Sequence, residues 1–474
     1  MKLVYNVNAK PKEIGYGKML VFALQQMLAI LAATIAVPAI VGNGMSASAA
    51  LFGAGVGTIV YLLFTKFRSP VFLGSSFAFI GSMLAAFAGG VSASAGFLGL
   101  IIGAAMAGLV YVIIALVVKV AGVRWINKLM PAVVIGPTVA LIGLSLAVNA
   151  VNDAVSVGLN SDGVRPMTVH AWLCLLCALV TLAVVIICSV YGKKMAKMIP
   201  FIIGILAGYG VAAVFTVIGI ATKNDVLKII DFTKFENMQW YPDFTFVEAF
   251  KGNYNWGSYG SFGSFLAVLA VAYVPVAFVV FAEHIADHKN LSSIIEKDLL
   301  EDPGLDKTLL GDGVGSAVGA FFGGCPNTTY GESVGCVAIS GNASVWTILT
   351  TAVMAIVASF FAPFVTFLST IPSCVMGGVC ISLYGFIAVS GLKMVQKVNL
   401  EDNGNLFTVS VILITGIGSM ALLIGKIKLT AVACALILGI LTNLLVSRSH
   451  KKGAEIEANT EEKTEETKET VETK

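Results

Sequence analysis

The chain has 474 residues, of which 57% are hydrophobic and 12% are charged. Soluble globular domains average about 45–50% apolar and about 25% charged residues, so this composition excludes an ordinary soluble fold. The formal net charge is +3, and the lysines and arginines gather at the ends of apolar segments. Such a distribution of positive charge gives no indication of a nucleic-acid partner.

Apolar segments of about 20 residues, the length of a helix that spans a bilayer, follow a short polar tail at residues 1–17. No small-residue cleavage site follows the first of them, so we interpret it as a retained span and not as a signal peptide. The predicted spans before the polar loop 221–260 are 18–41, 47–65, 71–89, 94–119, 131–151, 168–191 and 198–220. Those after the loop are 261–285, 306–322, 326–340, 344–366, 372–390, 404–424 and 428–447. Residues 448–474 have few apolar residues and are predicted to form a disordered tail.

We therefore predict an all-α polytopic membrane protein with fourteen transmembrane segments, seven on each side of the loop. With the N-terminus in the cytoplasm, 20 Lys and Arg residues fall on the cytoplasmic side and 7 on the opposite side, not counting the 3 of the distal tail. This bias follows the positive-inside rule and predicts a multi-pass protein of the cell membrane with both termini in the cytoplasm.

Prolines interrupt matching spans of the two halves. Pro70 and Pro326 open the third and tenth spans, and Pro131 and Pro372 open the fifth and twelfth. Because seven is an odd number, the second half would be inverted relative to the first. Short segments interrupted by Gly and Pro at matching positions are typical of transporter binding sites at a repeat interface. The sequence thus predicts two inverted seven-helix repeats.

The stretch 323–335 is polar, contains a carboxylic acid and lies among long apolar segments. Pro326 has no backbone N–H to donate and favours an extended neighbour, so residues 327–330 are predicted to be a short extended piece before a half-length helix. The third span is predicted to break in the same way at Ser75 and Ser76. Irregular backbone at membrane depth is tolerated only where it is buried in protein or lines a cavity. A binding site is therefore expected at these two breaks.

Acidic residues inside the predicted spans are few. Glu283 lies deep in the eighth span and Glu332 in the tenth, while Asp287 follows Glu283 at i+4 on the same helix face. A buried ionised carboxylate is costly, so such groups take up a proton, pair with another group, or serve a substrate or ion pathway. The alternatives are a structural hydrogen bond for Glu283 and a solvated helix end for Asp287.

The same helix carries His284 and His288, which with the two acids resemble a set of metal ligands at i, i+4 spacing. On a helix, however, the histidines face differently from the acids, no third group of ligands is evident, and a HExxH arrangement is absent. We predict no metal site and no cofactor. An intramembrane metal-dependent hydrolase is kept only as an alternative function.

Several motifs resemble those of one transporter family. They are Leu24-Gln25-Gln26 and Val37-Pro38, Gly74-Ser75-Ser76-Phe77-Ala78-Phe79, Ala282-Glu283-His284, Asp302-Pro303-Gly304-Leu305, Pro326-Asn327-Thr328-Thr329-Tyr330-Gly331-Glu332, and Pro372 with Met376-Gly377-Gly378-Val379. In these residues the chain is similar, over about 15–447, to the nucleobase–cation symporters of the nucleobase/ascorbate transporter family. Within that family it most resembles the bacterial uracil permeases.

The resemblance implies a core domain that moves against a gate domain to give alternating access. The core domain would consist of 18–119 and 261–366, and the gate domain of 131–220 and 372–447. The resemblance also implies short antiparallel strands where the broken third and tenth spans meet, and a homodimer in the lipid bilayer.

Carried over residue by residue, the resemblance assigns the substrate contacts to Glu283 and to the backbone amides at Phe77 and Gly331. Asp287 would join Glu283 and Glu332 in proton coupling. The other residues implied are Tyr330, Ala33 and Glu332, which would line the site, and Gln26, Ser75, Ser76, Asn327, Thr328 and Thr329, which would support it. For the hydroxyl and amide residues, the alternative is simple contact between helices.

Uracil is a planar, neutral base with two ring N–H donors and two carbonyl acceptors. Glu283 could accept from the N–H groups, and free backbone N–H groups at the starts of the two half-helices could donate to the carbonyls. An unpaired partner would cost about 1–3 kcal/mol, so this pattern would reject a base with the wrong edge. Phe77 and Tyr330 could add stacking and apolar contact.

We therefore predict a proton-coupled uracil importer that is not an enzyme, in which Glu283 or Glu332 is protonated when the site closes. Sodium is the alternative ion, and xanthine or another pyrimidine is the alternative substrate. A passive anion channel or exchanger would want a cationic site, whereas the central residues here are acids. Two departures from the family pattern bear on the proton relay: Gln26 stands where many relatives carry His, and Asp287 where one pattern has His.

Overall fold

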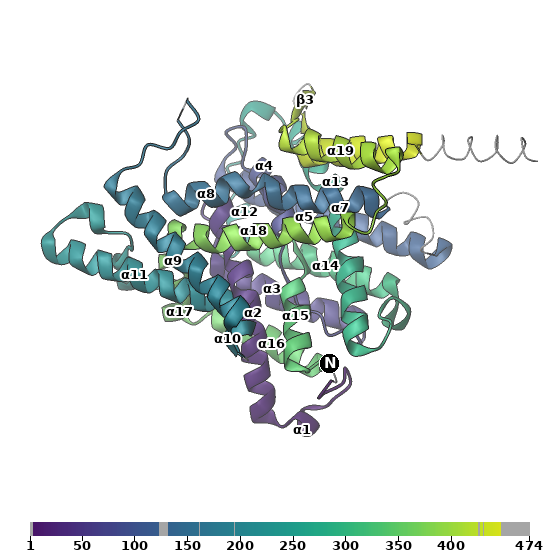
Figure 1. The fold of residues 1–474 in the computed structure, drawn as a ribbon, viewed down its shortest axis with the longest axis horizontal. Helices are drawn as coiled ribbons and strands as arrows, with labels where there is room; N and C mark the ends of the chain where they lie inside the picture. The colour runs from purple at the N-terminus through teal and green to yellow at the C-terminus, as the bar shows by residue number, and fades with distance from the viewer. Residues whose placement is uncertain are drawn as a thin grey trace, which may run out of the picture.

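The computed structural model describes residues 3–122, 131–160, 162–193, 195–424, 427–429 and 431–446. These ranges contain eight helices long and apolar enough to cross a membrane. They are α2 (Tyr16–Val41), α3 (Ala47–Phe64), α5 (Ala93–Ala121), α7 (Ala132–Ser145) continued by α8 (Ala147–Val155), α9 (Val169–Tyr191), α11 (Pro200–Thr222), α13 (Phe262–Ile295) and α18 (Ser373–Val395) (Figure 1). A ninth is added if α16 (Val345–Ser359) and α17 (Ala362–Thr370), bent by 81° against each other, are one span. A helical, multi-pass membrane protein is confirmed.

The remaining helices are shorter or more polar. Those that lie among the long helices are α4 (Ile80–Ala86), α14 (Leu305–Gly323), α15 (Gly331–Ser340), α19 (Asn403–Ile417) and the helix Ala431–Val446. Short connecting helices are α1 (Pro11–Ile14), α10 (Met195–Met198), η5 (Leu300–Gly304) and, in the polar loop, η2 (Asp225–Leu227), η3 (Phe232–Asn237), α12 (Thr245–Ala249) and η4 (Gly257–Tyr259). The count of fourteen spans therefore stays a prediction, and the tail 448–474 lies outside the described residues.

Two predicted boundaries differ from the structure. The eighth span was expected to end at residue 285, but α13 continues to Ile295, so Asp287 lies inside a helix and not at its solvated end. The last two spans were expected to meet near residue 426, but α19 ends at Ile417 and the strands β3 (Leu422–Ile424) and β4 (Ile427–Leu429) form a hairpin there. Ser419 adopts a positive φ of 54°, which a continuing helix cannot accommodate.

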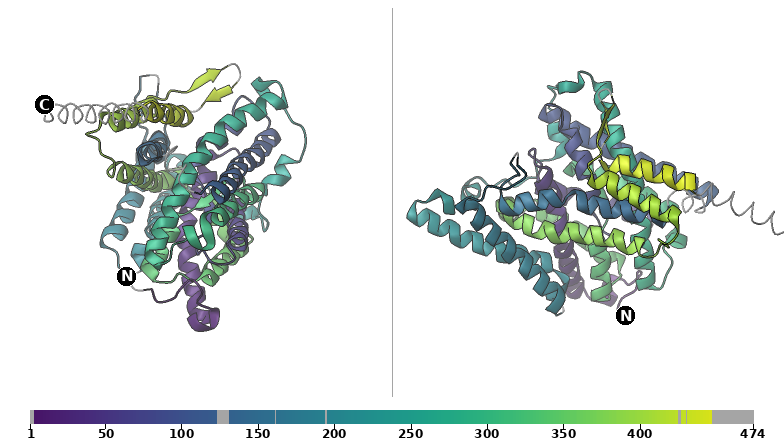
Figure 2. Two further views of the ribbon diagram at one scale, coloured as in Figure 1. Left: turned by 90° about the vertical axis from the view of Figure 1, so that its right-hand side faces the viewer. Right: turned by 45° about the horizontal axis from the view of Figure 1, so that its top comes forward.

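The long helices pack as two groups (Figures 1 and 2). One group contains α2, α3, α5, α13, α14 and α16, and the other contains α7, α8, α9, α11, α18 and α19. In Figure 1, α18 of the second group crosses α2 of the first. The first group draws its helices from both halves of the chain, and so does the second.

Helices α3 and α14 meet backbone to backbone within the first group. A Cβ added to Gly57 would lie 2.7 Å from the carbonyl oxygen of Gly315, and one added to Gly53 would collide with the carbonyl of Gly319. Small residues that allow such close approach hold membrane helices together where lipid removes the hydrophobic driving force. The two helices therefore form a single tight unit.

Two short strands at the centre of the first group belong to two broken segments. Strand β1 (Leu73–Ser75) pairs antiparallel with β2 (Asn327–Thr329), as expected for the third and tenth segments. Each strand leads into a helix: β1 into η1 (Phe77–Phe79) and α4, and β2 into α15. Residues 70–86 are called the first arm below, and residues 326–340 the second arm. Their pairing brings the starts of two helices together inside the protein.

The N-terminal tail pairs with the loop after the second arm. Tyr5 forms a parallel bridge with Asn342, and the amides of Val4 and Tyr5 donate to the carbonyl oxygen of Gly341. Gly341 closes α15 with a φ of 66°, a conformation that favours glycine. The Ser340-Gly341-Asn342 sequence thus provides both the end of α15 and an edge for the tail.

Candidate functional site

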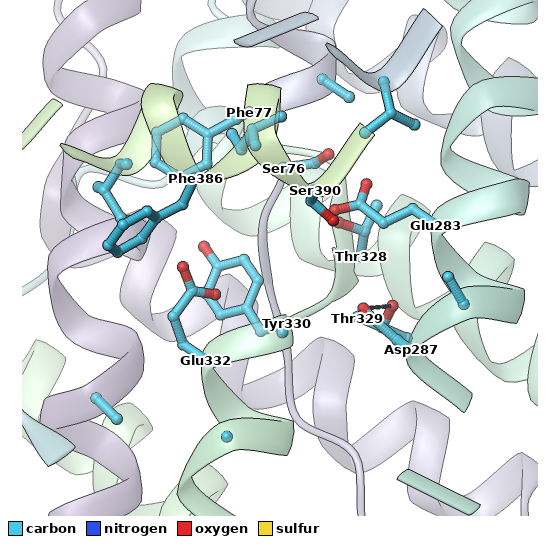
Figure 3. Close-up of a pocket in the computed structure, with 18 of the residues that line it drawn as sticks. Ser76, Phe77, Glu283, Asp287, Thr328, Thr329, Tyr330, Glu332, Phe386 and Ser390 are labelled. Atoms are coloured by element: carbon cyan, nitrogen blue, oxygen red, sulfur yellow. Dashed lines mark hydrogen bonds between the residues drawn. The ribbon is translucent and has the colours of Figure 1, made fainter. Parts of the chain in front are cut away.

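A cavity of about 450 Å³ lies between the two helix groups at the two arms. Its polar lining residues are Ser76, Ser189, Lys197, Glu283, Asp287, Thr328, Thr329, Tyr330, Glu332 and Ser390. Figure 3 shows Glu283 and Asp287 on one side of this space and Tyr330 and Glu332 on the other. The second helix group closes the cavity with apolar side chains of α7, α11 and α18. The cavity therefore combines the predicted breaks with the predicted acids.

The charged residues that line the cavity, within the described part of the chain, are Glu283, Asp287, Glu332 and Lys197. Glu283 and Asp287 face the cavity because α13 is continuous through both and they are four residues apart. The hydroxyl of Thr329 donates to Oδ2 of Asp287 at 2.7 Å. Three carboxyl groups around one cavity repel one another when ionised, so they are suited to hold a proton or to accept hydrogen bonds from a neutral ligand.

Both arms present a helix start to the cavity. The first helical hydrogen bond of α15 runs from Val334 to Tyr330, so the amide of Gly331 lies ahead of it. In the first arm, η1 starts at Phe77 after Ser76. Neither start carries a side-chain cap, and both Phe77 and Gly331 line the cavity. Backbone N–H groups in these positions have no partner within their helix and are available to an acceptor.

Tyr330 joins the two arms. Its hydroxyl donates to the carbonyl oxygen of Ser75 at 2.7 Å, and its ring lies so close to Gly74 that any Cβ there would collide with it. Ser75 is buried and contributes this carbonyl, but it does not line the cavity. The ring of Tyr330 is therefore fixed at the cavity wall by the opposite strand.

Other predicted supporting residues act behind the cavity. Asn327 donates from Nδ2 to the carbonyl oxygen of Gly53 at 3.0 Å, and Nε2 of Gln26 donates to the hydroxyl of Ser333. Neither Asn327 nor Gln26 lines the cavity, whereas Ser76, Thr328 and Thr329 do. Ala33 is buried on α2 but does not line the cavity either; Ala29, one turn earlier, does.

The two histidines of α13 point to its other face. His284 Nδ1 lies 2.6 Å from Oδ2 of Asp312 on α14, and its Nε2 lies 3.0 Å from the hydroxyl of Thr308. That hydroxyl also donates to the carbonyl oxygen of Leu305 at 3.1 Å.

His288 Nε2 lies 2.7 Å from the hydroxyl of Tyr61 on α3, and its Nδ1 lies 2.8 Å from the carbonyl oxygen of His284. Both histidines are fully buried. They are thus hydrogen-bonded to α3 and α14, away from Glu283 and Asp287. In the described part of the chain, no group of three or more His, Cys, Asp or Glu side chains could hold a metal ion.

Sequence reasoning missed the wall supplied by α18. Phe386, Ser390 and Met394 line the cavity at intervals of four residues, and the Phe77 ring meets Tyr384 edge to face with 5.7 Å between centroids. The polar Ser390 within an apolar helix was the available signal. It was weak because a lone serine is equally compatible with contact between helices.

Comparisons with known proteins decide the family. The xanthine–uracil permease model, described as "Permease family", matches residues 17–425. The chain belongs to the nucleobase/ascorbate transporter family. Among its relatives in this family, the uracil permease of Bacillus caldolyticus is 38% identical over 437 residues, which is 91% of this chain and 92% of that protein. The uracil permease of Bacillus subtilis (strain 168) is 36% identical over 92% of this chain and 94% of that protein.

A solved structure supports the fold of this family member. The transmembrane domain of the cyanobacterial bicarbonate transporter BicA superposes with a TM-score of 0.60, covering 90% of this chain and 96% of that one. The two sequences are 16% identical, so the likeness concerns the fold alone. It agrees with the helical membrane architecture and does not bear on what the cavity binds.

Proposed function

We propose that the chain is a secondary active importer of uracil, coupled to proton symport, in the cell membrane with both termini in the cytoplasm. One observation carries the substrate: a single cavity is lined by the Glu283 carboxyl group and by the uncapped starts of η1 and α15. The carboxyl group accepts from the ring N–H groups of uracil, and the amides at Phe77 and Gly331 donate to its carbonyls. The names of the relatives support uracil as the base.

Proton coupling is proposed from the acids. Glu283, Asp287 and Glu332 share a cavity in which the charged lining residues include one lysine, Lys197, which is exposed. A neutral base adds no charge to this site, so a proton bound to one of the acids lowers their repulsion while the site closes. We assign Glu283 to both base and proton, and Glu332 and Asp287 to the proton relay.

The proposed mechanism is alternating access. The first helix group, with both arms, acts as the core domain and the second group as the gate domain. We propose fourteen crossing segments in two inverted repeats, in which each half contributes one arm, and a homodimer of such subunits. The strand-to-helix plan common to both arms supports the repeat.

The substrate is tested by thermal stabilisation of the purified full-length protein with a panel of nucleobases. Uracil at a hundredfold excess over its Kd should stabilise the folded state by about 2.7 kcal/mol. Glu283→Gln should remove this stabilisation, and Glu296→Gln, at the exposed end of the same helix, should keep it. Stabilisation by xanthine or another pyrimidine and not by uracil would assign the broader or different substrate instead.

Coupling is tested in proteoliposomes that report internal pH. Uracil should drive proton uptake, with choline in place of sodium making no difference. Glu283→Gln and Glu332→Ala should each abolish this uptake while the purified proteins keep their helical content. Unaltered uracil-driven proton uptake in both variants would refute the role of these two acids in coupling. If uracil uptake required sodium, sodium would be the coupled ion in place of the proton.

A further inference from the structure

A second cavity, of about 510 Å³, lies on the far side of Phe77 from the site. Its walls come from η1 and α4 of the first arm, from α7, α8 and α13, and from α19 with the helix that follows it. The polar lining residues are Ser82, Ser145, Asn149 and Ser419, and none of the described residues that line it is charged. These residues suit a neutral polar solute, because an ion would find no charged partner among them.

The two cavities extend toward opposite ends of the helices. The site cavity reaches Lys197 and Met394, next to the lysine-bearing ends of α9, α10 and α18. The second cavity reaches Ser145 and Asn149, which lie in the half of the α7–α8 span that is farther from its start at Ala132. It also reaches Ser419, just beyond the C-terminal end of α19. By the positive-inside rule the first end is cytoplasmic and the second faces outward.

Three residues line both cavities: Phe77, Ala78 and Ile142. Phe77 is 9% exposed and Ile142 is 5% exposed, so buried apolar side chains separate the two cavities. Phe77 and Ala78 belong to the first arm, and Ile142 belongs to α7 of the other helix group. The partition is thus made by apolar contact across the boundary between the two groups, and a relative movement of the groups can open it without breaking a hydrogen bond.

We infer that the second cavity is the outer half of the substrate route, and that Phe77, Ala78 and Ile142 form the barrier between it and the site. This inference rests on the proposed function, since it assigns a path to the same base. A competing outer cavity of about 630 Å³ lies among α2, α17 and the polar loop. It is lined by the charged Lys234 and Asp243, and it shares no lining residue with the site cavity.

A matched pair of serines distinguishes the two outer cavities. Ser145 lines the proposed route and Ser369 lines the competing cavity. Both are exposed, and each hydroxyl donates at 2.8 Å to a carbonyl three residues earlier in its own helix. Ser145→Cys and Ser369→Cys therefore create equivalent thiols. Each full-length variant is treated in intact cells with a membrane-impermeant cationic methanethiosulfonate, and the wild type controls for the eight native cysteines.

Modification of Ser145→Cys should lower uracil uptake by about tenfold or more, equivalent to a barrier of about 1.4 kcal/mol. Modification of Ser369→Cys should leave uptake as in the untreated variant. Loss of uptake in Ser369→Cys, alone or together with Ser145→Cys, overturns the route. So does full labelling of Ser145→Cys without any loss of uptake.

The barrier has a test that needs no substrate, so its outcome is independent of the proposed function. Ser390 lines the site cavity, on the inner side of the partition. In Ser390→Cys combined with Ile142→Ala, the externally added reagent should label the thiol about tenfold faster than in Ser390→Cys alone. An unchanged rate overturns Ile142 as part of the barrier, even if uracil transport is established. If the thiol is labelled faster but the protein does not transport uracil, the proposed substrate is refuted and the proposed barrier stands.

Discussion

The two arms follow one plan, a strand that leads into a helix start, but they are held in place differently. The first arm is bound mainly through its backbone. The amide of Leu73 donates to the hydroxyl of Thr58 on α3 at 2.9 Å, and the amide of Ser76 donates to the carbonyl oxygen of Pro326 at 2.9 Å. One side chain adds to these backbone bonds: the hydroxyl of Ser82 donates to the carbonyl oxygen of Ala272 on α13 at 2.6 Å. The first arm carries no charged side chain from Val71 to Ala86.

The second arm is bound by its own side chains. Asn327 reaches α3, Thr329 reaches α13, Tyr330 reaches the first arm, and Ser333 receives a hydrogen bond from α2. It also carries Glu332. Because each bond goes to a different element, the second arm is fixed in position from four directions.

The two arms therefore have different roles. The second arm holds the acid and is tied to the first helix group, whereas the first arm places Phe77 against Tyr384 and Ile142 of the other group. On the proposed mechanism, the second arm keeps the site in shape and the first arm makes the contact that changes.

The largest effect is expected from Glu332→Ala, which gives the second arm the apolar helix start of the first. Uracil uptake should fall by at least about a hundredfold, the size typical for loss of a group that transfers a proton. Ser340→Ala, at the far end of α15, should transport like the wild type in the same assay. Uptake that survives in Glu332→Ala would show that the arms do not differ in chemistry.

Thr329→Val removes the hydroxyl that donates to Asp287 and leaves this acid without that partner. Loss of a hydrogen bond to a charged group costs about 1.5–3 kcal/mol, and we expect this decrease in the free energy of unfolding. The neighbouring Thr328→Val is the control, because it makes the same chemical change without affecting that bond. Equal losses in denaturant titrations of the two variants would contradict the role of the bond.

Gly74→Ala places a methyl group against the ring of Tyr330 and strains the contact between the arms. Overpacking of this kind costs about 1–3 kcal/mol. Gly81→Ala makes the same substitution in α4, where a Cβ meets nothing within 4 Å, and should stabilise the helix by about 0.5–1 kcal/mol. Melting temperatures that shift in the same direction for both variants would argue against the contact.

Ser82→Ala removes the hydrogen bond by which α4 of the first arm is held to α13. A neutral hydrogen bond contributes about 1 kcal/mol, so the decrease in stability should be smaller than for Thr329→Val. Urea titrations of the two variants side by side measure the comparison between the arms directly. A larger decrease in stability for Ser82→Ala than for Thr329→Val would show that the first arm is held more strongly than the second.

The smallest effect on stability is expected at Asp302, whose partner Arg68 lies just before the first arm. Asp302 pairs with Lys297 at 2.7 Å and with Arg68 at 2.9 Å, and these cations hold the pKa of its carboxyl group below the usual range. Since the pKa is depressed in the folded state, the stabilisation is present above the ordinary Asp pKa and is lost as the pH falls through the folded value.

Because the side chain of Asp302 is 46% exposed, Asp302→Asn should cost less than about 1 kcal/mol at neutral pH and nothing at acidic pH. Thermal melts at the two pH values measure this difference. A cost that persists at acidic pH would rule out the ion pairs as its cause.

The local sequence predicted the breaks well, because their causes are local. Pro70 and Pro326 stand before them, and the Gly, Ser, Thr and Asn residues that follow do not continue an apolar helix. The antiparallel pairing of the strands could not be read from such patterns, since it joins segments about 250 residues apart in sequence, and it was expected only through the family resemblance.

Polar residues of the site could be predicted from the sequence because they stand out in apolar helices. Apolar residues that line the cavity through packing could not. Glu283 and Asp287 are conspicuous in an apolar helix, and the structure places both at the cavity. Phe386 and Ile142 lie in helices that are apolar on every side, so no contrast indicates which face meets the cavity. Asn327 is polar for another reason: it bonds to a backbone carbonyl exposed by the close glycine contact of α3 and α14.

The hydrogen bonds of His284 and His288 fix the direction in which Glu283 points, although neither histidine side chain contacts it. An α-helix turns by about 100° per residue, so a slip of α13 by one position would carry Glu283 away from the cavity. The same slip would break the bonds to Asp312 and Tyr61 on the opposite face, where all of these side chains are buried and would lose their partners. The orientation of Glu283 is thus fixed from the opposite face of α13. On the proposed mechanism, a change at Asp312 would weaken substrate selection without altering any atom that contacts the substrate.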